Sequence, residues 1–158
     1  MRRFAAILAL SLSALIAVSP VTSQTPAKVQ PKLEPIAETK LLMEGLAHSN
    51  FRGIERLLVQ KPAEVQNWTF ARGQALLIAE TANLLMLRPP KSQGQPIWFD
   101  RATELRTSAQ ELAKLLAAQD YEKSKNGLVQ MAGTCNKCHQ AFRVPVQIAA
   151  FGDKAIED

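Results

Sequence analysis

Apolar residues recur every three or four positions through four successive stretches of the chain, a spacing that predicts four amphipathic helices. The first helix is expected over residues 36–60 and the second over residues 62–87. The third is expected over residues 96–119, and the fourth follows it at once. Short connections join these stretches, so the sequence predicts an all-α fold, an antiparallel four-helix bundle over residues 36–145.

Prolines and one aspartate mark the expected helix ends. Pro62 and Pro96 suit the first turns of the second and third helices, where a missing N–H costs nothing. Pro89 favours an end to the second helix just before it. Asp120 is a suitable N-cap for the fourth helix, and Pro145 is expected to stop it.

The apolar stripes indicate which side of each helix faces the interior. The third helix has a regular seam, and the first and fourth helices have stripes of the same stepping. The second helix is apolar almost all round, so it is either deeply buried or part of a subunit interface. The expected interior positions are Met43, Ala47, Phe51, Ile54 and Leu58, then Trp98, Ala102, Leu105, Ala109, Leu112 and Leu116, then Leu128, Ala132, Cys135, His139 and Phe142.

Outside the bundle, residues 1–23 have the pattern of a cleaved secretory signal peptide. An uncleaved anchor is the alternative, but the apolar run of 4–18 is shorter than the roughly 20 residues that a span needs. Residues 24–35 contain three prolines and are expected to form a flexible leader, and residues 146–158 a C-terminal tail. The signal predicts export to the periplasm.

Charge narrows the choice of partners. The formal net charge is +5, and cleavage after Ser23 removes two arginines and no acid, which leaves +3. This excess is too small to argue for nucleic-acid binding. It is compatible with docking on an acidic redox partner around Lys137 and Arg143.

The strongest chemical signal is the sequence Cys135-Asn136-Lys137-Cys138-His139. It is a C-x-x-C-H motif, the attachment site of a c-type haem, and it contains both cysteines of the chain. Each thiol can form a thioether with one vinyl group of a haem, and His139 is then placed to bind the iron. We therefore expect one covalent haem c as cofactor.

Other chemistry is compatible with some of these residues. A redox-active dithiol also uses C-x-x-C, though usually after a strand. A zinc ion needs about four ligands, which Cys135, Cys138, His139 and His48 would just supply, although adjacent Cys138 and His139 are poorly placed for it. A disulfide between the two cysteines is what an exported protein without haem would form.

The motif lies on the last helix, followed by Gln140-Ala141-Phe142-Arg143 and preceded by a helix that opens Pro96-Ile97-Trp98. In this arrangement the chain resembles the class II c-type cytochromes, that is, cytochrome c′ and its low-spin, methionine-ligated relatives. The resemblance covers residues 36–144 and is strongest over 96–144. It implies that Cys135 and Cys138 attach the haem, that His139 is the proximal ligand, and that Arg143 is the basic residue beside it. An equally good interpretation of Arg143 is an exposed cation that complements the dipole at a helix end.

The sixth iron ligand is left open by the sequence. In methionine-ligated relatives a methionine of the first helix binds the iron, which makes Met43 the candidate. Met43 is one position off the family's register, in which Glu44 would take the ligand position. One residue is about 100° around a helix, and a methionine on an apolar stripe is often plain core. His48 is the other candidate; Met86 and Met131 are expected to pack in the core.

These residues predict a periplasmic protein that transfers single electrons between periplasmic or membrane-bound donors and acceptors. The alternative is a five-coordinate, cytochrome c′-like protein that binds NO or CO in an apolar pocket formed by Leu42, Leu46 and the second helix. An enzyme such as a peroxidase is not expected, since His48 is the one histidine left for acid–base work. The resemblance also implies a homodimer through the first two helices.

Overall fold

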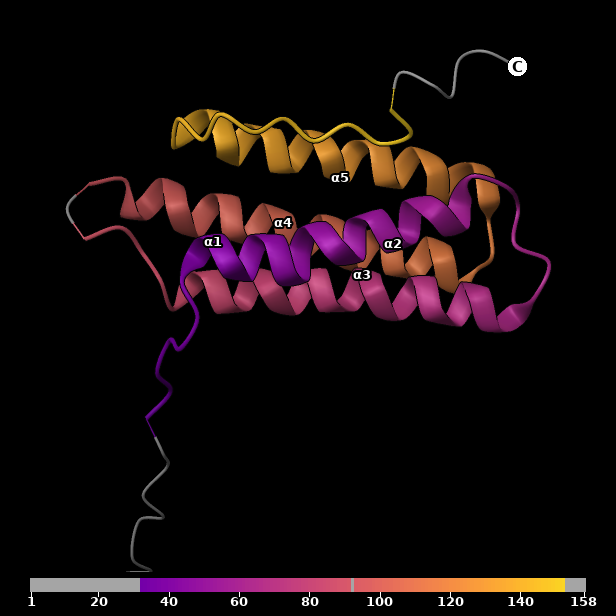
Figure 1. Cartoon of the computed structure of the whole chain (residues 1–158), viewed down its shortest axis with the longest axis horizontal. Helices are drawn as coiled ribbons and strands as arrows, with labels where there is room; N and C mark the ends of the chain where they lie inside the picture. The colour runs from indigo at the N-terminus through magenta and orange to yellow at the C-terminus, as the bar shows by residue number, and fades with distance from the viewer. Residues whose placement is uncertain (1–31, 92, 153–158) are drawn as a thin grey trace, which may run out of the picture. The chain divides into compact units, whose positions relative to one another are not determined.

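The four expected helices are present in the computed structural model, which describes residues 32–91 and 93–152. The first is continuous but has three parts, and no strand occurs among the described residues, so the all-α four-helix prediction is confirmed (Figure 1). The predicted signal peptide and most of the predicted leader lie outside the described residues. The segments are α1 (Thr39–Leu42), η1 (Met43–His48), α2 (Ser49–Leu58), α3 (Val65–Met86), α4 (Gln95–Ala117) and α5 (Tyr121–Ala141).

The helices pack in chain order, with α3 along α4 and α4 along α5, while α2 packs against α3 and to a smaller extent against α5. The predicted apolar stripes form the core between them. On the second helix the burial is one-sided, because Leu76 and Leu77 are exposed while Ala75 and Ile78 are buried. The largest fully buried apolar side chains are Ile54, Leu58, Ile78, Leu112, Leu116, Leu128 and Met131.

Two helix ends differ from those expected. Pro62 precedes α3, which begins at Val65; the Trp68 indole N–H donates to the Pro62 carbonyl at 3.0 Å, so this turn is bound to the helix that follows. Helix α5 ends at Ala141, and the prediction that Pro145 stops it was wrong. Asp120 is its N-cap as predicted, accepting from the Lys123 backbone N–H.

The end of α5 is a Schellman motif. The Val144 N–H donates to the His139 carbonyl at 2.8 Å, and the Arg143 N–H donates to the Gln140 carbonyl at 3.2 Å. Arg143 has a φ of 55°, in the left-handed region where glycine is usual. The motif reverses the chain, so residues after 143 run back along α5 rather than away from it (Figure 1).

A π-helical segment, η1, interrupts the first helix. A π-helix holds one more residue in each hydrogen-bonded turn than an α-helix does, so η1 shifts the register of everything before it. The Ser49 hydroxyl donates to the Glu44 carbonyl at 2.9 Å, across five residues. The apolar periodicity gave no sign of this segment, since both Met43 and Phe51 lie on the expected stripe; its trace in the sequence is the position of Met43, one residue off the family's register.

Among the described residues, none of the helices combines the length and the apolar character that crossing a membrane requires.

Candidate functional site

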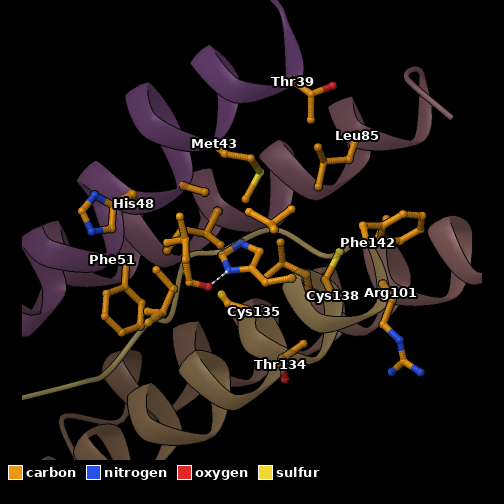
Figure 2. A pocket seen from close by; sticks show the side chains of 18 of the residues that line it. Thr39, Met43, His48, Phe51, Leu85, Arg101, Thr134, Cys135, Cys138 and Phe142 are labelled. Carbon is orange, nitrogen blue, oxygen red and sulfur yellow. Dashed lines mark hydrogen bonds between the residues drawn. The ribbon is translucent and has the colours of Figure 1, made fainter. Parts of the chain in front are cut away.

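The bundle contains an apolar cavity of about 620 Å³ between the first helix and the C-terminal half of α5. Figure 2 shows its labelled lining, with Thr39 and Met43 on one side and Cys135 and Cys138 across from them. Side chains from α3 and α4 complete the wall. The lining includes Ala47, Phe51, Ile78, Leu85, Trp98, Ala102, Leu105, Met131, Phe142, Val144, Val146 and Ile148.

The C-x-x-C-H motif occupies the last turns of α5 and faces this cavity. Cys135, Cys138 and His139 all line it, because residues three and four apart share one face of a helix. Both cysteines are free thiols. The structure therefore brings together the three residues that the sequence singled out first, on a single wall of a single cavity.

The state of the two thiols argues against a redox-active dithiol. Burial raises the pKa of Cys135 to about 12, with a further contribution from Cys138, and burial also raises the pKa of Cys138. A dithiol that attacks disulfides needs a thiolate and hence a lowered pKa. These two thiols are held in their neutral form, in apolar surroundings that suit the edge of a haem.

The zinc alternative also finds no support. No group of three or more histidine, cysteine, aspartate or glutamate side chains in the described part of the chain is placed to hold a metal ion. His48 borders the cavity but is exposed, and its Nε2 accepts a hydrogen bond from Arg52 Nε at 3.2 Å. In Figure 2 the His48 ring lies at the side of the site.

A backbone carbonyl fixes the tautomer of His139 that can bind a metal. Its Nδ1 lies 2.8 Å from the Val146 carbonyl oxygen. A carbonyl can only accept, so this bond requires the proton on Nδ1 and leaves the lone pair on Nε2. That is the tautomer in which an imidazole binds a metal through Nε2.

Met43 is the thioether that the first helix presents to the cavity. It lies at the start of η1, half-buried, and Figure 2 shows its sulfur directed into the site. Glu44, which the family's register would place there, is exposed and pairs with Lys40 at 2.7 Å. The prediction that Leu42 and Leu46 form the pocket wall was wrong: Leu42 is buried in the core and Leu46 is exposed, and neither lines the cavity.

Two arginines lie near the haem motif, and only one of them lines the cavity. Arg143 is exposed at the C′ position of α5 and does not line the cavity, so its role beside a haem stays a prediction. Arg101 of α4 does line it; one of its guanidinium nitrogens pairs with Glu104 at 2.6 Å, and its Nε is buried without a partner. Nothing in the sequence marks Arg101 as a site residue, because its position on the third helix belongs to no motif.

The donor set and the cavity fit a c-type haem. Cys135 and Cys138 would attach it, His139 would bind the iron from one side, and Met43 is the available soft donor from the first helix. The apolar lining suits a porphyrin, and the orphaned Arg101 Nε is a donor suited to one of the cofactor's acidic groups. The fold and the site together are those expected of a four-helix, haem-binding c-type cytochrome.

The family model described as Cytochrome C' matches residues 95–143, which comprise α4, α5 and the whole C-x-x-C-H motif. The match confirms the resemblance to the class II c-type cytochromes, and it supports haem binding by this chain. Among curated proteins and among solved structures, none matches the chain.

Proposed function

We propose that this protein is a periplasmic electron carrier that holds one haem c through Cys135 and Cys138, with His139 and Met43 as the axial ligands. The observation that carries the proposal is the position of Met43, whose thioether enters the cavity from the first helix while His139 lines it from α5. When bound, haem supplies one-electron chemistry, and the chain supplies the ligands and the surroundings.

The residues of the site would favour reversible electron transfer. A thioether ligand stabilises Fe(II) and raises the reduction potential relative to harder ligands. Filling both axial positions leaves no site for a substrate, and the apolar lining from Phe51, Ile78 and Leu85 keeps water out. We expect no enzymatic turnover, since His48, the histidine that borders the cavity from the first helix, is exposed and accepts a hydrogen bond from Arg52.

The apolar lining also supports the second candidate, a five-coordinate protein that binds NO or CO. Beside Met43, the first helix and α3 place Ala47, Phe51 and Leu85 in the lining, and none of these three can bind iron. Glu44 and His48 also border the cavity, but both are exposed and paired, Glu44 with Lys40 and His48 with Arg52. If Met43 does not coordinate, a small uncharged gas would find an open position in an apolar pocket.

An absorption spectrum of the haem-loaded protein, with and without CO, separates the two functions. We expect a low-spin spectrum in both oxidation states that does not change when CO is added to the reduced protein. A high-spin spectrum that shifts on CO addition would instead establish an open iron, and the gas-binding function would replace electron transfer.

We further propose that the protein forms a homodimer through the exposed side of α3. Val65, Phe70 and Leu77 are 59%, 62% and 50% exposed there, a large apolar surface for a helix of a monomer. They line a groove with Gly73, which has no neighbour near its Cβ position and so allows close approach of a second helix. Gln74 borders the same groove with a buried Oε1 that has no partner. A second copy would cover this surface by two-fold symmetry.

Replacing Phe70 and Leu77 together by glutamate is expected to convert the dimer into a monomer. The pair of charges would be buried in the interface without partners, which costs several kcal/mol. Sedimentation velocity measures the change, and Phe99→Glu on α4, where Phe99 is 39% exposed, is the control that should remain dimeric. A wild-type protein that sediments as a monomer at micromolar concentration would refute the dimer.

A further inference from the structure

The residues after α5 form an extended strap, residues 144–151, that runs back along the helix that has just ended (Figure 1). Val144, Pro145, Val146 and Ile148 of the strap line the cavity. The strap is therefore one wall of the site, although the sequence marks it only as a tail.

The strap is fixed at three places along its length. Its start is set by the Schellman motif at Arg143 and Val144. Its middle is held by Asn136, whose side-chain amide donates to the Ile148 carbonyl and accepts from the Ile148 N–H, both at 2.8 Å. This reciprocal pair imitates one rung of a β-ladder, with a side chain in place of a neighbouring strand.

The third attachment comes from α2, on the other side of the cavity. Arg52 donates to the Ala149 carbonyl at 3.1 Å, and the Glu55 carboxylate accepts from the Phe151 N–H. Arg52 and Glu55 also pair with each other at 2.7 Å, with side chains 34% and 13% exposed. The strap thus joins α5 to α2 along one wall of the cavity.

Val146 lies between the first and second attachments, so the position of its carbonyl is determined from both sides. That carbonyl is the group that accepts from His139 Nδ1. Asn136, which holds the strap, is itself the residue after Cys135 in the C-x-x-C-H motif. The motif and the strap are therefore bound to each other twice, through Asn136 and Ile148 and through His139 and Val146.

We propose that the strap is a positioning element for the proximal ligand: anchored by Asn136 and Glu55, it presents the Val146 carbonyl to His139 Nδ1–H. This inference rests on the proposed function only in requiring that His139 binds the haem iron. The bond fixes the rotation of the imidazole ring about its own axis and makes the ring a stronger electron donor. A stronger donor favours Fe(III), so the strap holds the reduction potential below the value that the free ligand pair would give.

The test is Asn136→Ala in the haem-loaded protein, with Gln147→Ala as the matched control. Gln147 is an exposed residue of the strap itself, next to Ile148. The readouts are the exchange of the His139 Nδ1 proton with solvent, followed by NMR, and the reduction potential. We expect Asn136→Ala to speed the exchange about tenfold or more, the change that the loss of ordinary hydrogen bonds produces, and to raise the potential. Gln147→Ala should alter neither.

Two further variants separate positioning from a general loss of structure. Asn136→Asp keeps the acceptor for the Ile148 N–H and should restore part of the exchange protection. Glu55→Ala removes one of the two bonds that hold the far end of the strap, leaving the Arg52 bond to Ala149, and it does not touch the haem motif. It should speed exchange in the same direction, whereas Glu111→Ala on the exposed side of α4 should not. If Asn136→Ala and Glu55→Ala both retain slow exchange and the wild-type potential, the strap does not position His139.

Failure of the proposed function has a different signature. If His139→Ala retains the wild-type absorption spectrum, His139 is not the ligand and the proposed function is wrong. If that spectrum is lost as expected while the strap variants behave as wild type, the axial ligand stands and the strap inference alone fails.

Discussion

Met43→Ala is expected to change the low-spin, CO-insensitive protein into one that binds CO in its reduced form. Met43 is the side chain that the first helix directs into the cavity with a donor atom suited to iron, and its neighbours in the lining, Ala47 and Phe51, cannot replace it. The reduction potential should fall at the same time, because axial ligands set haem potentials over a range of roughly 0.8 V and the thioether is on the high side. Absorption spectra with and without CO, and a redox titration, measure both changes.

Two controls separate coordination from packing at this position. Met43→Leu keeps the volume of the side chain but removes the sulfur, so it should bind CO as Met43→Ala does. His48→Ala should leave the spectrum unchanged, because the His48 ring is exposed and bound by Arg52. Persistence of the low-spin spectrum in Met43→Ala, with its loss in His48→Ala, would assign the sixth ligand to His48 instead.

Leu128→Ala is expected to reduce the free energy of unfolding by about 2–5 kcal/mol, the usual cost of emptying a buried leucine site. Leu128 is fully buried on α5, in the core below the haem motif. The adjacent Val129 is 52% exposed on the same helix, so Val129→Ala should change stability by no more than about 0.5 kcal/mol. Denaturant unfolding of the haem-loaded protein, followed by circular dichroism, compares the two.

Equal stabilities of the two variants would contradict the packing of α5. The comparison is sharp because the residues are neighbours, both are in the middle of one helix, and both become alanine. The difference between them therefore reports burial, since helix propensity changes little and in the same direction in each.

The bundle and the haem motif could be predicted from sequence because both depend on local spacing. Leu112 and Leu116 on α4, and Leu128 and Ala132 on α5, are each spaced by the period of a helix, and their burial follows from that spacing. The haem motif also depends on local spacing, because the spacing of Cys135, Cys138 and His139 is itself the chemical signature. A single turn of helix fixes their relation, whatever the rest of the chain does.

The features that sequence reasoning missed depend on contacts between distant residues. The strap needs Glu55 and Asn136 to meet residues 148–151, and the Schellman turn at Arg143 has a side chain where glycine would signal it. Arg101 reaches the cavity only because α4 packs beside α5. Local periodicity does not reveal contacts between distant residues. A segment without apolar repeats, such as the strap, is therefore predicted to be a tail.

The register of Met43 illustrates a third kind of difficulty. Counted back from Phe51, Met43 appears one residue out of place, yet the structure directs it into the cavity. The π-turns of η1 take up the extra residue, so the departure in sequence is compensated in three dimensions. Counting residues along an ideal helix cannot detect such compensation.

The π-helical segment η1 also separates the part of the first helix that packs in the core from the residue that faces the cavity. Below η1, α2 is committed to the core through Phe51, Ile54 and Leu58, which fix its rotation. Met43 is the first residue of η1, so the angle at which it meets the cavity is set by the winding of η1 rather than by those core contacts. Evolution could therefore adjust the approach of the ligand by changing the winding alone, leaving the side chains that hold the bundle together as they are.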